Sequence, residues 1–237
     1  MNVVLLRVGI DRGCGGIHSP LFKDGTFEFL PIPDDDGWDE HTYGNTTCRR
    51  GRKLVDNFPP RRQAAAAKQA MHVDPEFSTF TYVDPTIPKR GLAHLKPGDL
   101  LVFYAGMEGW DCERLPALYL AGFFEVKVVG FAAQLPAETV RREFAGNFHV
   151  RHRALYAAQK DRLVLVKGTQ KSRLFRCACK LGGAVRRTNG SVWQIILPEM
   201  AKIFGRFGGI GSIQRSTPRW VENKKVPGAA AFVRSLA

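Results

Sequence analysis

The stretch that decides the fold lies at the N-terminus, where residues 3–20 read VVLLRVGIDRGCGGIHSP. Residues 3–6 form a short apolar run of the kind that builds a buried strand. Charges and glycines follow at once, and a second strand-like run, residues 27–32, closes at Pro33 and Asp34. Polar, glycine-rich segments directly after a core strand are typical of binding and catalytic loops. A tight surface turn is the alternative that this pattern leaves open.

Length and composition bound the class of protein. The 237 residues are enough for a substantial core, and no clear linker divides them, so we expect one domain over residues 1–237. The 24 Gly and 14 Pro argue against a helix-only fold. No apolar run approaches the roughly 20 residues that span a bilayer, and Arg7 and Asp11 interrupt the N-terminus too early for a secretory signal. We therefore expect a cytoplasmic protein that is not bound to a membrane.

Strand patterns outnumber helix patterns, and the two are mixed along the chain. Apolar runs predict strands at 100–105, 117–129, 162–167 and 192–196. Helices are predicted at 61–71 from alanine content, and at 136–145 and 198–206, which begin at prolines. Residues 34–60 indicate one long loop, of the kind that forms lids or binding loops. The predicted fold class is α+β, with a mixed, mostly antiparallel sheet and a few flanking helices.

The turn at Lys96-Pro97-Gly98-Asp99 is compatible with a second, alternative fold. This turn leads into the strongly apolar strand at 100–105, and a further strand pair follows after an acidic loop. The order of turn and strands resembles the small barrels of the PUA, ASCH and EVE type, which cradle a nucleotide or a modified base. A PUA-like small barrel is therefore the alternative to an open sheet.

The five cysteines are Cys14, Cys48, Cys112, Cys177 and Cys179. Their number is odd, and their spacing fits no zinc site of the usual kind. Alternation along residues 174–181 puts Cys177 and Cys179 on one face of a strand. The simplest interpretation is that they are two small buried hydrophobic side chains.

The excess of positive over negative charge is confined to the C-terminal part of the chain. Residues 1–130 hold 15 Lys and Arg against 17 Asp and Glu, a net charge of −2, whereas residues 131–237 hold 20 against 5, a net charge of +15. Basic residues interleaved with aromatic ones indicate a folded face for a polyanion, and a nucleic acid is the expected partner. A solvated face and an anionic membrane surface are the alternatives. The arginines assigned to nucleic-acid binding are Arg141, Arg142, Arg151, Arg153, Arg186 and Arg187.

Candidate catalytic side chains fall where strand patterns end. Asp11 follows the first strand, and Asp74 sits between His72 and a proline, where the position before proline favours an extended backbone. Together with His149, these residues supply the groups for a nucleophile or base and an acid, and they also fit a divalent metal. The alternatives are a turn or cap role for Asp74 and a purely structural role for His149.

Four residues are assigned to substrate binding: Arg7, His18, Ser19 and Tyr104. An arginine at a strand end beside Asp11 either pairs with that carboxylate or clamps a phosphate. The sequence lacks the signatures of P-loop nucleotide triphosphatases, Rossmann dinucleotide-binding proteins, zinc deaminases and G-x-S-x-G hydrolases. It leaves the cofactor, the metal requirement and the oligomeric state unknown.

Several stretches carry a family resemblance over most of the chain. They are residues 6–11 with Ser19-Pro20, 24–26, 30–34, 72–76, 98–100, 148–150, 155–156, Trp193 and 197–198. In this order they resemble the third class of nucleotide-modification-associated domains, a family associated with the modification of DNA bases. The resemblance implies an enzyme that acts on a nucleotide or on a base in DNA through the Asp, His and Arg set. The alternative is a non-catalytic PUA-like reader that holds a modified base in an aromatic pocket.

Overall fold

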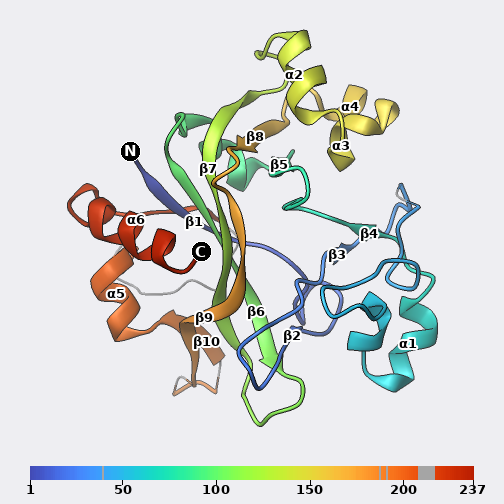
Figure 1. Ribbon diagram of the computed structural model, residues 1–237, viewed down its shortest axis with the longest axis vertical. Coiled ribbons are helices and arrows are strands. Elements are labelled where there is room, and N and C mark those ends of the chain that lie inside the picture. The colour runs from blue at the N-terminus through green and yellow to red at the C-terminus, as the bar shows by residue number, and fades with distance from the viewer. Residues whose placement is uncertain (39, 187, 191, 208–216) are drawn as a thin grey trace.

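A mixed β-sheet crosses the middle of the molecule (Figure 1). The computed structural model describes residues 1–237 except 39, 187, 191 and 208–216. The central strands are β6 (Leu100–Gly109) and β7 (Ala117–Phe131), which pair antiparallel. β1 (Val3–Arg7) and β2 (Ser19–Leu21) both pair parallel with β6. The N-terminal strand therefore ends, at Arg7, beside the middle of the longest strand pair.

The remaining strands extend this sheet in antiparallel fashion. They are β5 (Thr81–Asp84), β8 (Val164–Gly168), β9 (Arg173–Arg186), β10 (Val192–Ile196) and β11 (Arg219–Trp220). The main path runs β10-β9-β7-β6-β1-β11, and β8 joins β7 to β5. A separate short pair consists of β3 (Ile32–Pro33) and β4 (Met71–His72). The α+β prediction is confirmed, whereas the pairings of the described residues do not close into the alternative small barrel.

Helices flank the sheet on one side and at one end (Figure 1). α5 (Pro198–Phe204) and α6 (Val226–Ser235) lie together on one side, and α2 (Ala137–Phe144), α3 (Phe148–Arg151) and α4 (Arg153–Gln159) cluster at the end near β5 and β8. α1 (Pro60–Ala66) lies apart from them, with β3 and β4. The 3₁₀ turns are Leu54–Asn57, Ile87–His94 and Asn223–Lys225.

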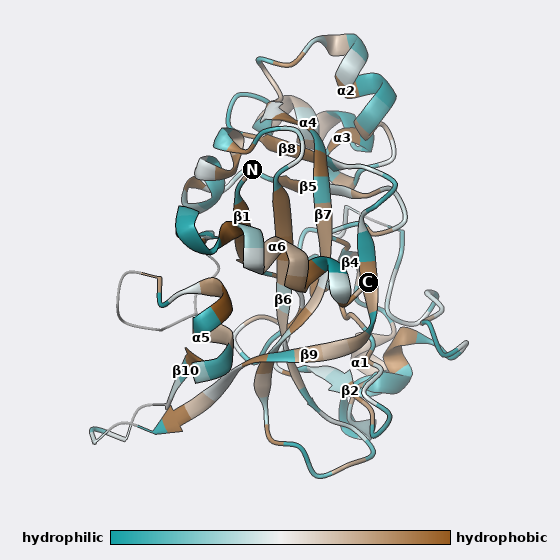
Figure 2. Ribbon diagram, turned by 60° about the vertical axis from the view of Figure 1, so that its left-hand side comes forward, coloured by the Kyte–Doolittle hydropathy of each residue, from teal (hydrophilic) through white to brown (hydrophobic). Residues whose placement is uncertain are grey.

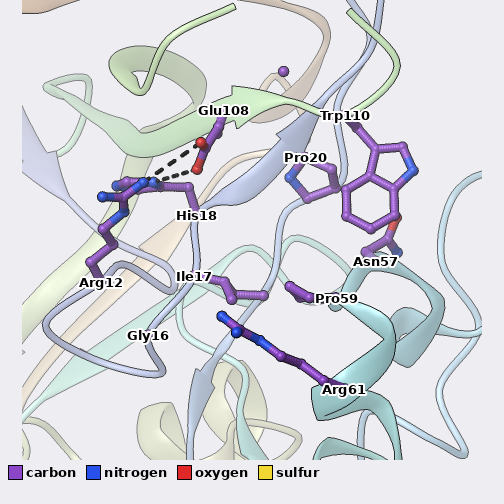
Figure 3. A pocket seen from close by; sticks show the side chains of 11 residues that line it. Arg12, Gly16, Ile17, His18, Pro20, Asn57, Pro59, Arg61, Glu108 and Trp110 are labelled. Carbon is purple, nitrogen blue, oxygen red and sulfur yellow. Dashed lines mark hydrogen bonds and ion pairs between the residues drawn. The ribbon is translucent and has the colours of Figure 1, made fainter.

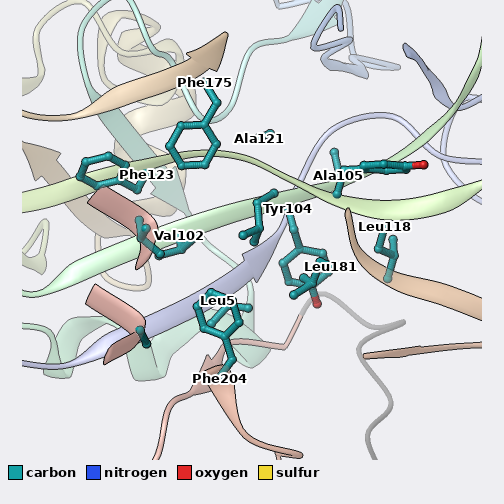
Figure 4. Close-up of a cluster of buried hydrophobic side chains, with 14 of the residues drawn as sticks. Leu5, Val102, Tyr104, Ala105, Leu118, Ala121, Phe123, Phe175, Leu181 and Phe204 are labelled. Carbon is teal, nitrogen blue, oxygen red and sulfur yellow. The ribbon is translucent and has the colours of Figure 1, made fainter. Parts of the chain in front are cut away.

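Each face of the sheet has its own hydrophobic core. Leu5 and Val102 belong to the cluster that α5 and α6 cover (Figure 4). Leu101 and Phe103, one residue out of phase, pack with Phe124 on the opposite face. Because both faces are buried, β6 and β7 are nearly continuous apolar runs (Figure 2), and each enclosed large side chain contributes about 1.5–3 kcal/mol.

Most predicted elements are present with shifted ends. The strands predicted at 100–105 and 117–129 extend to Gly109 and Phe131, and that at 162–167 begins at Val164 and ends at Gly168. The helix predicted at 198–206 ends at Phe204, because Gly205 takes a positive φ of 88°. The helix predicted at 61–71 ends at Ala66, since the chain must reach the β4 strand.

The strand predicted at 27–32 is wrong for most of its length. Only Ile32 belongs to a named strand, and Phe27 forms a single bridge with Leu21. Prolines 31 and 33 have no backbone N–H to donate to a ladder. Phe27 and Leu30 are both buried but in different clusters, so the segment turns between two cores rather than running along one.

Residues 34–60 are anchored to the rest of the chain. Tyr43 and Phe58 are fully buried, pack edge to face at 4.8 Å between ring centroids, and share a hydrophobic cluster with Leu54. The Tyr43 hydroxyl also donates a hydrogen bond to the Pro31 carbonyl at 2.7 Å. The prediction of a long loop is right in its lack of extended secondary structure, and the loop is anchored to the core through Tyr43, Leu54 and Phe58.

The interpretation of Cys177 and Cys179 as buried hydrophobic side chains is wrong. Cys177 is exposed and Cys179 is half-buried. This part of β9 lies beside the turn at residues 24–26, where Thr26 forms a bridge with Cys177. A turn covers the strand less completely than a full neighbouring strand does, which leaves the Cys177 side chain at the surface.

Candidate functional site

Three distant segments meet at one cavity of about 280 Å³. β1 and the loop after it supply Arg7 and Asp11, β4 and the residues after it supply His72 and Asp74, and β5 supplies Asp84. The other lining residues are Val8, Gly9, Cys14, Ile32, Tyr82 and Lys89. Four of the predicted site residues therefore share one cavity, although the sequence separates them by more than sixty positions.

The loop after β1 is built around the Asp11 carboxylate. One oxygen of Asp11 accepts hydrogen bonds from the backbone N–H groups of Gly13 and Cys14, both at 2.8 Å, and the other pairs with the Arg7 guanidinium at 2.8 Å. Gly15 has a φ of 95°, and a Cβ there would come within 2.4 Å of Ile10. Asp11 is thus a loop-shaping carboxylate that also orients Arg7.

His72 is held by a strand pairing, and Asp74 by a hydrogen bond of its side chain to a neighbouring strand. His72 lies opposite Ile32 in the β3–β4 pair. Asp74 follows two residues later, before a cis peptide bond to Pro75, and its carboxylate accepts a hydrogen bond from the Val83 backbone N–H at 3.2 Å. Burial, together with the nearby negative charge of Asp84, raises the pKa of the Asp74 carboxyl well above its usual range.

Asp84 is the fixed anion of the cavity. Its carboxylate accepts hydrogen bonds from the Lys89 ammonium at 2.6 Å, from the Tyr82 hydroxyl at 3.0 Å and from the Thr86 backbone N–H at 2.7 Å. Burial raises the pKa of the Asp84 carboxyl, but the charge and hydrogen bonds of Lys89 and the bonds from Thr86 more than offset it, so the net shift is downward. The cavity thus contains two neighbouring carboxyl groups whose pKa values are shifted in opposite directions.

His149 reaches the same region from α3, behind the cavity wall. The N-terminus of α3 is fixed by two buried polar side chains, because Glu76 accepts a hydrogen bond from the Phe148 N–H at 2.6 Å and Asn147 caps the His149 N–H at 3.0 Å. Asn147 also donates to the Thr81 hydroxyl at 3.0 Å. These bonds join α3 to the segment that carries Asp74.

The His149 ring is 4% exposed, and one of its two nitrogens is committed. Nδ1 lies 2.8 Å from the side-chain amide oxygen of Gln159, which can only accept a hydrogen bond, so Nδ1 carries the hydrogen. Burial lowers the pKa of His149, and the Gln159 bond opposes that shift only in part. The ring is therefore neutral at physiological pH, with a lone pair on Nε2, a buried atom without a hydrogen-bond partner.

Aromatic packing brings His149 and His72 together. The His72 ring stacks on Phe148 at 4.3 Å between centroids and meets the His149 ring edge to face at 4.7 Å. One ligand atom each from His72, Asp74 and His149 lie within 4.8 Å of one another. This is the set of described residues whose donors are arranged to hold a metal ion.

The loop after β1 also lines two wider cavities, of which one adjoins the first. One of about 810 Å³ shares Arg7 and Asp11 with it and adds Arg12, His18 and Arg186, among others. The second, of about 500 Å³, is shown in Figure 3. There the Arg12 and His18 side chains both turn toward Glu108, at 3.6 and 3.2 Å, from the side opposite Trp110.

Two residues predicted to bind substrate lie in the interior instead. Ser19 is fully buried in β2, and its hydroxyl accepts a hydrogen bond from the Leu30 N–H at 3.2 Å. Tyr104 is fully buried in β6, and burial raises its pKa to about 12. Neither lines any of the three cavities. Both positions are core positions of the sheet, which the strand pattern around them would have indicated.

The arginines assigned to nucleic acid do not form one surface. Arg141 and Arg142 are exposed on α2, and Arg151 and Arg153 are exposed on α3 and α4, at one end of the molecule. Arg186 is exposed at the end of β9, near β10 at the other end (Figure 1). Arg187 lies outside the described residues. Arg142 is in addition engaged by Glu143 at 3.1 Å.

Sequence reasoning missed the second aspartate of the cavity, although a signal was present. The triplet Val-Asp-Pro occurs twice, at residues 73–75 and 83–85. Both aspartates line the cavity, and the backbone of the second triplet holds the carboxylate of the first. Tyr82 and Lys89 carry no comparable signal, because their contacts depend on the turn after β5.

The fold and the cavity together define an α+β protein with a buried histidine–aspartate cluster beside a charged cleft. The chain belongs to the family of nucleotide modification associated domain 3, whose model matches residues 2–230. No curated protein and no solved structure matches the chain significantly. No helix among the described residues is long and apolar enough to cross a membrane.

Proposed function

We propose that this protein modifies the base of a nucleotide or of a nucleic acid in the cavity of about 280 Å³. The observation that carries the proposal is the convergence of Arg7, Asp11, His72 and Asp74 on that cavity, with His149 directly behind His72. Membership of a family associated with nucleotide modification supports the choice of substrate class.

The sizes and charges of the adjoining cavities fit the two parts of a nucleotide. The smaller cavity is of the size of a single base, and its wall carries the histidine and carboxyl groups. The adjoining cavity of about 810 Å³ carries Arg12 and Arg186, and Arg7 lines both. A base in the first and a sugar-phosphate in the second would place the phosphate against guanidinium groups, which bind phosphate in a planar, bidentate way.

The charged lining favours an enzyme over a passive reader of modified bases. A reader needs a mostly apolar, aromatic pocket with a few hydrogen-bonding groups. This cavity has three carboxyl groups, those of Asp11, Asp74 and Asp84, and Tyr82 is its aromatic lining residue among those described. Ionisable groups with oppositely shifted pKa values, facing a cleft, are typical of acid–base or metal-assisted chemistry.

The roles we propose differ among the residues. His72 and Asp74 present their polar groups to the cavity and act on the base. Arg7 faces both cavities and binds the nucleotide, whereas Asp11 positions Arg7 and the loop. Asp84 is neutralised by Lys89 and orients the cavity wall.

Mass spectrometry of nucleosides tests the proposal. Free nucleotides and DNA are incubated with the protein, with and without divalent metal, then digested and analysed for altered bases. We expect a changed base with the native protein, loss of the change in Asp74→Asn, and full retention in Asp161→Asn, an exposed aspartate outside the cavity. Tight binding with unchanged bases under every condition would favour the reader instead.

Binding to DNA has a separate test. Charge reversal at Arg141 and Arg153, both exposed on the α2–α4 end, is expected to weaken DNA binding. It should also lower the salt dependence of binding by about 0.9 for each phosphate that the protein no longer neutralises. Lys68→Glu, an exposed change beyond α1, serves as the control. Binding that is insensitive to salt would exclude a polyanion at this surface.

A further inference from the structure

We propose that His72, Asp74 and His149 hold a divalent first-row transition-metal ion in the wall of the cavity. This proposal deepens the proposed function, and it rests on that function only for the role of the ion in the reaction. The ion site itself stands on the positions of three side chains and on a buried ring nitrogen of His149 without a hydrogen-bond partner.

His149 provides the independent observation. Its Nε2 is buried without a hydrogen-bond partner, in a residue that is 4% exposed. A buried polar atom without a partner costs about 1–3 kcal/mol. Coordination of a metal ion by the Nε2 lone pair would remove that cost. The opposite nitrogen donates to Gln159, which is the arrangement that fixes a metal-binding imidazole in the correct tautomer and orientation.

The distances are compatible with coordination after a small contraction. The three donor atoms lie within 4.8 Å of one another. Bonds of roughly 2.1 Å place the ligands of one ion about 3–3.5 Å apart, so binding draws the donors together by up to about 1.3–1.8 Å. His72 and Asp74 both line the cavity, so we expect rotation of their side chains to supply that movement.

The donor set selects the class of metal. Two imidazole nitrogens and one carboxylate suit zinc, iron(II), cobalt(II) or manganese(II). Magnesium and calcium prefer all-oxygen ligands and would find only one carboxylate in the cluster. The two other carboxylates that line the cavity are already paired, Asp84 with Lys89 at 2.6 Å and Asp11 with Arg7 at 2.8 Å.

Three protein ligands leave coordination positions open. His72 and Asp74 both line the cavity, so an ion between them would face the space assigned to the base. Structural sites usually have four protein ligands, whereas catalytic sites leave a position for water or substrate. An ion here would act as a Lewis acid on a bound oxygen or nitrogen atom.

Metal titration of the chelator-treated protein, with no nucleotide present, tests the site. We expect one cobalt(II) per chain with the visible absorption bands of a four- or five-coordinate ion, and displacement by zinc(II) but not by magnesium. His149→Ala should lower cobalt affinity at least 100-fold, and Gln159→Leu, which removes the positioning bond, about 10–100-fold. His94→Ala, an exposed histidine elsewhere, should leave the affinity unchanged.

Circular dichroism of each variant controls for folding, and Asp74→Asn provides a nearly isosteric second variant. Binding that survives both His149→Ala and Asp74→Asn, or absence of cobalt binding by the folded native chain, would overturn the inference. The two proposals fail separately. Base modification that persists after chelation contradicts the ion alone, whereas a bound ion without base modification contradicts the proposed function alone.

Discussion

Replacement of Glu76 by alanine tests whether the fold holds α3, and with it His149, against the cavity. Glu76 is 5% exposed and accepts hydrogen bonds from the Phe148 N–H at 2.6 Å and from the Thr79 hydroxyl at 3.0 Å. The Thr79 hydroxyl has a second partner, Thr81, at 2.7 Å, so the mutation chiefly deprives the Phe148 N–H of its acceptor. The cost of the mutation therefore falls mainly on the N-terminus of α3.

The expected loss follows from these contacts. Hydrogen bonds to a charged acceptor contribute about 1.5–3 kcal/mol, and a buried N–H without a partner costs about 1–3 kcal/mol. Removing a buried carboxylate recovers part of its desolvation cost, so we expect Glu76→Ala to lower the free energy of unfolding by about 2–3 kcal/mol. Loosening of α3 should also weaken cobalt binding through His149.

Urea denaturation measures the free energy of unfolding, and cobalt titration below the unfolding transition measures the site. Glu138→Ala is the matched control, because Glu138 is exposed on α2 and meets Arg142 only at 3.9 Å. Its cost should stay below about 0.5 kcal/mol. If Glu76→Ala is as stable as Glu138→Ala, or if it loses stability with unchanged cobalt affinity, then Glu76 does not connect the fold to the site.

Three further predictions concern the ion pair in the cavity wall, the loop after β1 and the arginine assigned to phosphate binding. Lys89→Met should cost about 2 kcal/mol at pH 7, measured by thermal melting, because it leaves Asp84 buried without its cation. The net pKa of Asp84 is lowered, so the stability it contributes is present above an unfolded pKa of about 4 and is lost as the pH falls through the folded value. The native and Lys89→Met melts should therefore converge below pH 4, and a gap that is constant down to pH 3 would contradict the pairing. Gly15→Ala should cost about 1–3 kcal/mol in urea denaturation, whereas Gly228→Ala, at an open helical position, should cost nothing; equal effects would refute the loop geometry. Arg186→Ala should weaken binding of a nucleoside monophosphate about 3–10-fold in calorimetry but leave the nucleoside unaffected, and equal losses for both would remove the phosphate assignment.

The central sheet could be predicted from the sequence because its strands are buried on both faces. Continuous apolar runs such as residues 100–105 indicate a buried strand without any knowledge of the partners. The parallel pairing of β1 with β6 could not be predicted, since nearly a hundred residues separate the two strands. That the sheet stays open could not be predicted either, because it depends on β10 and β11 lying at its two opposite edges.

The site was predictable only where local sequence carries its chemistry. Asp11, His72 and Asp74 follow strand patterns or precede a proline, and they share the cavity. The neutral state of the His149 ring depends on burial, and its tautomer depends on Gln159, ten positions away; no local pattern reveals either. The arginines were grouped by charge alone. Charge does not reveal that α2 and the end of β9 lie at different ends of the molecule (Figure 1).

A crystal structure with a bound nucleoside 5′-monophosphate would show whether the small cavity receives a base and the wider one its phosphate. We expect density for the base between Arg7, His72 and Asp74, with the phosphate directed toward Arg12 and Arg186. Density for the nucleotide only at the α2–α4 end, with this cavity occupied by solvent alone, would contradict it.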